Sequence, residues 1–265
     1  MRFSANISML FREVPFLDRF RRARAAGFSA VEFWWPSEID PRAVQEAVVR
    51  ADVQVAAMNF DAGDMASGER GLVSDPARKE RFREHVPVAL RLAEAVNCTA
   101  MNALVGLRLP GISLEEQLDV MRRNVTWAAD QAAQQGSIVL IEAINSIENG
   151  PYLLTSTRQA SEFGKSVGRP NVMLQYDVYH MRRMVEDLAE TLRTYISEIG
   201  HVQIADCPGR GEPGTGEINF EFVLGELERL GYRGYVGLEY RPSTGNTEES
   251  LRWLPRAMRG ARATT

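Results

Sequence analysis

Near the middle of the chain the sequence reads Ser137-Ile138-Val139-Leu140-Ile141-Glu142-Ala143. Four apolar residues stand together here, and a carboxylate follows them directly. Strands of a parallel sheet have this near-continuous apolar character, because helices cover both faces of the sheet. The segment therefore predicts a buried parallel strand that carries an acidic side chain at its carboxyl end.

Short apolar runs of this kind recur along the whole chain and alternate with longer amphipathic segments. No linker rich in proline, glycine or serine interrupts the alternation, which is typical of repeated strand–helix units. We expect eight strands, at residues 3–6, 30–35, 53–60, 99–105, 137–143, 172–177, 201–206 and 235–239.

Helix boundary signals support the same count. Asp40-Pro41 and Asp75-Pro76 each place a capping acid before a first-turn proline, and Ser113 with Glu116 forms a capping box. A glycine near the end of an amphipathic stretch indicates a left-handed helix stop. We assign that role to Gly27, Gly136, Gly168, Gly200 and Gly231.

Eight such units with right-handed crossovers can close into a barrel. An open, doubly wound sheet would more often carry a glycine-rich nucleotide loop after its first strand, and none follows Asn6. The length of 265 residues suits one barrel. We therefore predict an α/β fold, a single-domain (β/α)8 TIM barrel over residues 1–265.

Composition narrows the classes of partner. The chain is 45% hydrophobic and 25% charged, with a formal net charge of −4, so we expect no attraction to nucleic acid or to an anionic membrane. We expect a small-molecule substrate and leave open whether the chain forms a homo-oligomer. The two cysteines, Cys98 and Cys207, form no disulfide framework, and no secretory leader or 18-residue apolar run is evident. We expect a cytoplasmic protein.

Polar residues end four of the expected strands, and these strands are neighbours around one side of a barrel. They are Glu142, Asp177, Gln203 and Glu239. Active sites of parallel barrels lie at the carboxyl ends of the strands. Three buried carboxylates repel one another unless a cation compensates them, and an all-oxygen ligand set favours Mg²⁺ or Mn²⁺. The alternative is that single members merely end a strand and pair with a basic side chain.

Further residues are expected to face the same rim. His180 follows Asp177 by one turn and is a candidate substrate contact, although a packing role is equally open. Arg210, in the glycine-rich loop at residues 206–217, is a candidate for binding a substrate carboxylate. Asn102, Glu32 and the pair Trp34-Trp35 are placed near the same rim, and the loop at residues 61–71 is long enough to act as a lid.

Several motifs together resemble the hydroxypyruvate isomerase family, which belongs to the xylose isomerase-like barrels. The resemblance spans nearly the whole chain and rests on five runs: residues 2–6, Gly68-Glu69-Arg70-Gly71, Gln175-Tyr176-Asp177-Val178-Tyr179-His180, Gln203-Ile204-Ala205-Asp206 and residues 211–219. Related sugar epimerases usually carry a metal-binding histidine where this chain has Gln203.

The resemblance implies that the substrate is a hydroxy-oxo acid and that the reaction interconverts hydroxypyruvate and tartronate semialdehyde through a cis-enediolate. It also implies that Glu142 and Glu239 act as the acid/base pair and as metal ligands. Asp177 and Gln203 would complete the metal site, and the second motif would add Glu69 and Arg70 to the substrate contacts.

Alternatives of the same mechanism are a 2-oxo-tetronate isomerase and a ketose 3-epimerase. A metal-dependent phosphodiesterase is a more distant alternative, because its trinuclear site needs several histidines and the chain has only His85, His180 and His201. A non-catalytic binding protein would have no physical reason to keep four matched ligands.

Overall fold

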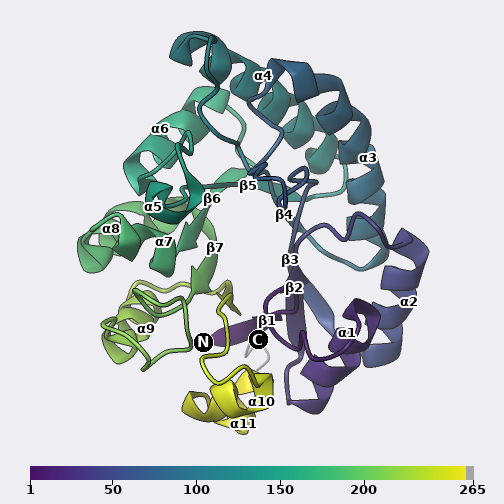
Figure 1. Ribbon diagram of the computed structural model, residues 1–265, viewed down its shortest axis with the longest axis vertical. Coiled ribbons are helices and arrows are strands. Elements are labelled where there is room, and N and C mark those ends of the chain that lie inside the picture. Colours follow the sequence, from purple (N-terminus) through teal and green to yellow (C-terminus); the bar gives the residue numbers. More distant parts are fainter. Residues whose placement is uncertain (261–265) are drawn as a thin grey trace.

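Eight parallel strands close into a barrel in the computed structural model, which describes residues 1–260 (Figure 1). Each strand pairs with its neighbour in the sequence, and the last pairs with the first. The predicted TIM barrel is therefore confirmed. The strands are β1 Arg2–Asn6, β2 Ala30–Phe33, β3 Gln54–Asn59, β4 Ala100–Asn102, β5 Ile138–Glu142, β6 Val172–Asp177, β7 Ile199–Ile204 and β8 Tyr235–Leu238.

One predicted helix stop is wrong. Gly200 lies inside β7, which begins two residues earlier than expected. A Cβ at this position would approach the side chains of Ile138 and Leu140 to 2.9 Å, so the glycine permits close packing inside the barrel. Its role is therefore steric and not that of a left-handed cap.

Helices surround the barrel and connect the strands. The longer ones are α1 Phe16–Ala25, α2 Pro41–Ala51, α3 Lys79–Ala95, α4 Leu114–Ala133, α6 Thr157–Val167, α8 Leu188–Tyr195 and α9 Phe220–Arg229. The short ones are α5 Ser146–Asn149, α7 Val178–Arg183, α10 Thr247–Ser250 and α11 Arg256–Arg259, with 3₁₀ turns at Pro76–Arg78, Ile196–Glu198 and Leu251–Trp253. In residues 1–260, none of the helices combines the length and apolar character needed to cross a membrane.

Helix caps follow the sequence signals in most places. Asp40 accepts a hydrogen bond from the Arg42 N–H at 2.9 Å, and Ser113 accepts one from the Glu116 N–H at 3.0 Å. Asp75 caps a 3₁₀ turn that leads into α3, and not an α-helix directly. The other four glycine stops follow helices with positive φ, as expected.

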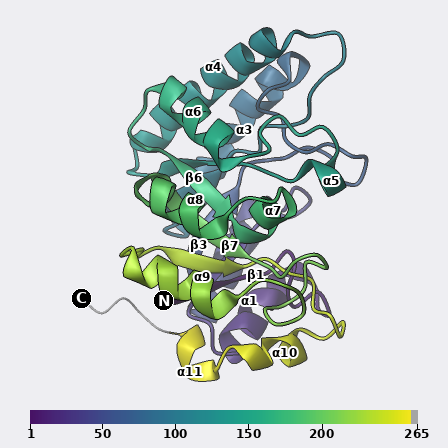
Figure 2. The ribbon, with the colours of Figure 1, turned by 90° about the vertical axis from the view of Figure 1, so that its left-hand side faces the viewer.

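The barrel interior changes character along its axis. Ala57, Ala100 and Leu140 form a small buried apolar cluster, separate from the main core between strands and helices. Toward the carboxyl ends the buried residues become polar, and α5, α7 and α10 lie at that end, opposite the N-terminus (Figure 2). The predicted site residues therefore lie at the carboxyl end, whereas Ser4, Glu32 and His201 are buried polar side chains deeper in the barrel.

Glu32 on β2 anchors this polar layer. Its carboxylate accepts hydrogen bonds from Ser4 Oγ and Gln203 Nε2, both at 2.7 Å, and lies 2.8 Å from His201 Nε2. Burial raises the pKa of Glu32, but the charge and hydrogen bond of His201, with those of Gln203 and Ser4, lower it on balance. Glu32 is therefore a buried, ionised side chain inside the barrel, and not a rim residue as the sequence suggested.

Gly237 on β8 faces this carboxylate, and a Cβ there would lie 2.5 Å from Glu32 Cδ. We predict that Gly237→Ala lowers the free energy of unfolding by about 1–3 kcal/mol, because the Glu32 side chain is held by Ser4, His201 and Gln203 and has no free space to move into. Chemical denaturation measures the change.

The matched control is Gly225→Ala in the middle of α9, where a Cβ meets nothing within 4 Å. This substitution should stabilise the protein by up to about 1 kcal/mol, because alanine favours helix. Equal stability of the two variants would contradict the steric role of Gly237.

Candidate active site

Strand register brings the four predicted metal ligands to one side of the barrel. Glu142 ends β5 beside Gln175, and Asp177 ends β6 beside Gln203. Glu239 follows β8 directly. All four predicted side chains are buried, with at most 5% of each residue exposed.

Glu142 is the most strongly perturbed carboxyl of the group. Its Oε2 accepts hydrogen bonds from Asn102 Nδ2 at 2.7 Å and Gln175 Nε2 at 2.9 Å, and within residues 1–260 its Oε1 has no hydrogen-bond partner. Burial raises the pKa of Glu142 well above its usual value, and the charges of Glu239 and Asp177 raise it further. A cation near Oε1 would offset both effects.

Asp177 holds the start of α7. Its Oδ1 accepts from the backbone N–H of Tyr179 at 2.8 Å and of His180 at 3.2 Å, which fixes the carboxylate at the helix N-terminus. Burial raises the pKa of Asp177 to about 7, although the Arg210 charge opposes this shift. Its other oxygen, Oδ2, lies 3.6 Å from His180 Nε2.

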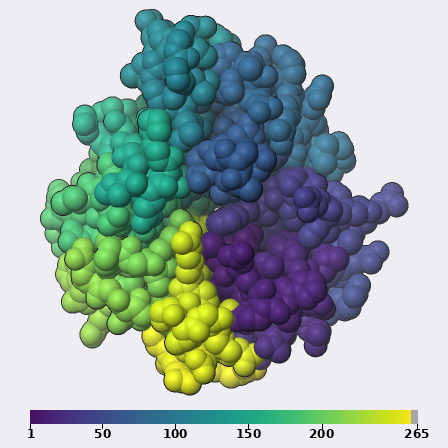
Figure 3. All heavy atoms as spheres, viewed as in Figure 1, coloured from purple at the N-terminus to yellow at the C-terminus, as the bar shows by residue number. Residues whose placement is uncertain are grey.

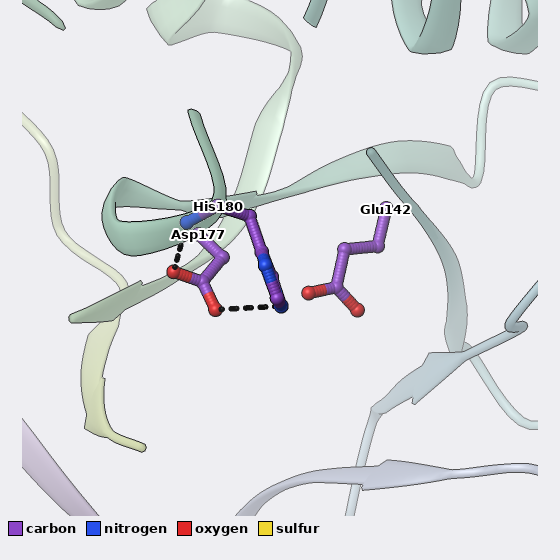
Figure 4. Close-up of side chains that lie close together, drawn as sticks. All are labelled: Glu142, Asp177 and His180. Atoms are coloured by element: carbon purple, nitrogen blue, oxygen red, sulfur yellow. Dashed lines mark hydrogen bonds and ion pairs between the residues drawn. The ribbon is translucent and has the colours of Figure 1, made fainter. Parts of the chain in front are cut away.

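His180 completes a compact group with Asp177 and Glu142. One potential ligand atom from each of the three lies within 4.8 Å of the others (Figure 4). Asn145 Nδ2 lies 2.7 Å from His180 Nδ1, so Nδ1 accepts and Nε2 is directed toward Asp177. Burial, and then the Arg210 charge, hold the pKa of His180 well below its usual value, so the ring is neutral.

Glu239 has donors at both oxygens. Oε1 accepts from Trp34 Nε1 at 2.8 Å and Asn6 Nδ2 at 3.0 Å, and Oε2 forms an ion pair with Arg210. Burial raises the pKa of Glu239, whereas Arg210 and Trp34 lower it in part. The ionised form of Glu239 is thus better supported than that of Glu142.

Arg210 is buried among the acids. Its guanidinium pairs with Glu239 and lies 3.9 Å from Asp177 Oδ2 and 5.2 Å from the centre of the Tyr179 ring. Burial lowers the pKa of Arg210, but the charges of Glu239 and Asp177 raise it on balance. Its charge is therefore already matched by protein carboxylates.

A cavity of about 480 Å³ opens above this group. It is lined by Glu142, His180, Arg210, Glu239 and Arg70 from the predicted set, and also by Ser8, Met9, Arg12, Arg19, Trp34, Asn59, Met65, Leu104, Ile144, Asn149 and Arg241. The loops after the strands meet around the cavity on the face shown in Figure 3. Of the predicted metal ligands, Glu142 and Glu239 line this cavity directly, whereas Asp177 and Gln203 are not among its lining residues.

Other predicted residues have different positions. Arg70 reaches the cavity and donates to Asn149 Oδ1 at 3.3 Å, but Glu69 instead pairs with Arg78 and accepts from the Asp64 N–H. Asn102 acts through its hydrogen bond to Glu142.

The two tryptophans also separate. Trp34 lines the cavity, whereas Trp35 packs against His85 with ring centroids 4.5 Å apart. His85 accepts from the Asp61 N–H, and His201 contacts Glu32. In the described part of the chain, His180 is therefore the single histidine on the cavity wall.

Sequence reasoning missed several contacts. Asn6 was expected only to end the first strand, but its Nδ2 also donates a hydrogen bond to Glu239 Oε1. Gln175 stands two residues before Asp177, and this spacing puts both side chains on one face of β6. Arg12, Arg19 and Arg241 carry no motif, because they reach the cavity from irregular segments and from α1.

The residues fit a hard divalent cation. Among the residues that the structure describes, Arg210 is the one positively charged side chain near the three buried carboxylates, and it forms an ion pair with Glu239. Two amide oxygens nearby, Asn102 Oδ1 and Gln175 Oε1, are buried without a hydrogen-bond partner within residues 1–260. Gln203 Oε1 accepts from Gln175 Nε2 at 2.8 Å. This oxygen-rich donor set suits Mg²⁺ or Mn²⁺ better than a soft metal.

Residues 20–257 match the xylose isomerase-like TIM barrel family. The hydroxypyruvate isomerase of Escherichia coli is 42% identical over 96% of this chain and 98% of its own length. A 2-oxo-tetronate isomerase of Pectobacterium atrosepticum is 37% identical, covering 95% and 96%. A solved structure from Brucella melitensis, described as an AP endonuclease of family 2, superposes with a TM-score of 0.91 at 38% identity, covering 95% and 97%.

The raised pKa of Glu142 leads to a prediction about stability. In EDTA, Glu142→Gln should melt a few degrees above the wild type at pH 8, because the variant keeps an acceptor for Asn102 and removes the cost of either ionising Glu142 in the barrel or holding it protonated. A raised folded-state pKa means that wild-type stability falls as pH rises above the unfolded value of about 4.5. The gap should therefore shrink toward pH 5.

Thermal denaturation between pH 5 and pH 8 measures this difference. Glu94→Gln, an exposed substitution on α3, is the control and should leave the melting temperature unchanged at each pH. A Glu142→Gln variant that melts below the wild type at pH 8 would show that the carboxylate stabilises the metal-free fold.

Proposed function

Because the chain belongs to the hydroxypyruvate isomerase family of xylose isomerase-like TIM barrels, and is thus an isomerase, we propose that it interconverts hydroxypyruvate and 2-hydroxy-3-oxopropanoate (tartronate semialdehyde). One observation carries the proposal: Glu142, at the end of β5, and Glu239, directly after β8, line one cavity, and β6 and β7 separate the two strands around the barrel. We also propose that residues 1–265 belong to one domain.

The two glutamates divide the proton transfer. Glu239, with donors at both oxygens, takes a proton from the hydroxymethyl carbon as general base and leaves an enediolate. Glu142, whose burial favours the protonated form, returns a proton to the neighbouring carbon, and the hydroxyl proton of the first carbon passes to the oxygen of the second, which leaves the aldehyde. The reaction is reversible, so the roles exchange in the other direction.

We propose that Glu142, Asp177, Gln203 and Glu239 hold a divalent metal, Mg²⁺ or Mn²⁺. When bound, such an ion stabilises negative charge that develops on the two substrate oxygens. Of the other predicted contacts, His180 presents a neutral ring whose Nε2 can donate to a substrate oxygen. Arg210 orients Glu239, and Asn102 orients Glu142.

The first test is turnover of hydroxypyruvate by the metal-loaded protein, with tartronate semialdehyde followed through a coupled reductase. We predict that Glu142→Gln and Glu239→Gln each reduce kcat by about a hundredfold or more, as expected when a general acid or base is lost. Near-normal turnover by either variant would rule out its assigned role. The Glu94→Gln variant controls for nonspecific effects.

Metal dependence needs its own measurement. EDTA treatment should abolish turnover, and Mn²⁺ or Mg²⁺ should restore it. Calorimetric titration with Mn²⁺ should show one site, with affinity at least about tenfold weaker in Asp177→Asn, because a ligating charge is lost. Full activity after exhaustive chelation would contradict the proposed metal site.

A second substrate deserves comparison. The relative from Pectobacterium atrosepticum is a 2-oxo-tetronate isomerase, and the cavity volume lies in the range that holds ligands well above three carbons. Better turnover of 2-oxo-tetronate than of hydroxypyruvate would keep the proton-transfer scheme and replace the substrate.

A further inference from the structure

Three arginines outside the acidic group line one wall of the cavity. Arg12 follows β1, Arg19 lies on α1, and Arg241 follows Glu239 by two residues. Because β1 and β8 pair to close the barrel, the segments after them are adjacent (Figure 3). A hydrogen bond from the Phe11 N–H to Thr247 Oγ1, at 2.7 Å, ties these segments together.

Within residues 1–260, no carboxylate forms an ion pair with any of these three arginines, and neither Arg12 nor Arg241 has a carboxylate oxygen within 4.0 Å of its guanidinium. Arg19 donates only to backbone carbonyls, of Ile7 at 2.9 Å and Val14 at 3.1 Å. Burial lowers the pKa of Arg19 and the nearby charge of Arg12 lowers it further, whereas the charge of Glu13 opposes the shift only in part.

The acids closest to this wall, Glu13 and Glu239, form their hydrogen bonds and ion pairs with other residues. Glu13 accepts from the Thr247 N–H at 2.6 Å and from Thr247 Oγ1 at 3.2 Å. Glu239 is paired with Arg210. The wall therefore holds three like charges beside a cavity, and an anion bound between them would relieve their repulsion.

We propose that Arg12, Arg19 and Arg241 form an anion subsite that binds the acid group of the substrate. The proposal rests on the proposed function and reassigns to these residues the carboxylate recognition that the sequence suggested for Arg210. Arg19, fixed by two carbonyls, is the rigid member of the subsite. Arg12 and Arg241 are exposed and supply free guanidinium donors.

The bound acid group has two possible sources. It is the carboxylate next to the reacting carbons, or a carboxylate or phosphate at the far end of a longer oxo acid. Both chemistries suit a guanidinium, which binds either group through paired hydrogen bonds. The cavity of about 480 Å³ has room for the longer substrate.

The decisive experiment compares wild type, the double variant Arg12→Gln/Arg241→Gln and the control Arg21→Gln, an exposed arginine on α1 outside the cavity. Calorimetric titration of the metal-loaded proteins with inorganic phosphate should show affinity at least about tenfold weaker in the double variant than in the control. Equal affinity in all three proteins, or no binding by the wild type, would overturn the subsite.

Turnover then identifies the source of the acid group. The panel is hydroxypyruvate, 2-oxo-tetronate, its 4-phosphate and dihydroxyacetone, a neutral hydroxymethyl ketone. A loss in kcat/KM for hydroxypyruvate at least tenfold greater than for dihydroxyacetone assigns the subsite to the adjacent carboxylate. A selective loss for the 4-phosphate alone assigns it to a distal anion.

The two hypotheses fail in different ways. If the wild type turns over no member of the panel, the proposed function fails, while the phosphate titration still decides the subsite. Equal losses for charged and neutral substrates, with unchanged melting temperature, would show that the arginines act on the reaction and not on the anion. That result would also overturn the subsite.

Discussion

Burial of carboxylate charge inside a narrow barrel is the constraint on which the rest of this structure depends. Glu32, Glu142, Asp177 and Glu239 are each at most 5% exposed. Glu32 is compensated within the protein, by His201, Gln203 and Ser4, and its pKa is lowered. In residues 1–260, Arg210 is the one arginine near the other three acids, and its single positive charge cannot compensate them all. Their pKa values are therefore raised. The difference separates a structural acid from acids kept available for a cation and a substrate.

The surrounding structure is arranged to hold these charges in place. Gly237 leaves room for the Glu32 side chain, and that carboxylate in turn fixes the Gln203 amide by accepting from its Nε2. The remaining oxygen of Gln203 then faces the acidic group, where Gln175 contacts it. Asn6 connects Glu239 to β1, the strand that closes the barrel. Hydrogen bonds from the barrel interior therefore fix the orientation of the reacting side chains. Electrostatic catalysis requires such a preorganised arrangement of polar groups.

Sequence reasoning recovered the barrel because its signals are local. Apolar runs and capping residues depend on neighbours along the chain. Gly200 was still assigned wrongly, because the sequence alone does not distinguish a glycine inside a strand from a glycine that ends a helix. The three acids and one amide at the strand ends, Glu142, Asp177, Glu239 and Gln203, were predictable from barrel anatomy alone. The position of Glu32 was not, because its partners come from β1 and β7, far away in the sequence. Arg210 was expected to meet the substrate, but its ion pair with Glu239 depends on a loop conformation, with φ of 55°, that no sequence motif specifies.

The charges around the cavity are sorted by position. Acids lie at the strand ends, where the barrel fixes their geometry, and unpaired arginines lie on the segments after β1 and β8, with Arg70 on the segment after β3. A rigid scaffold suits residues that transfer protons, because small displacements of these residues slow the reaction. Recognition of an acid group tolerates more motion, because a guanidinium on a long side chain can follow its ligand. Variation in the loops can therefore change which oxo acid is bound while the proton-transfer residues stay in place, which fits a family whose members act on hydroxypyruvate and on 2-oxo-tetronate.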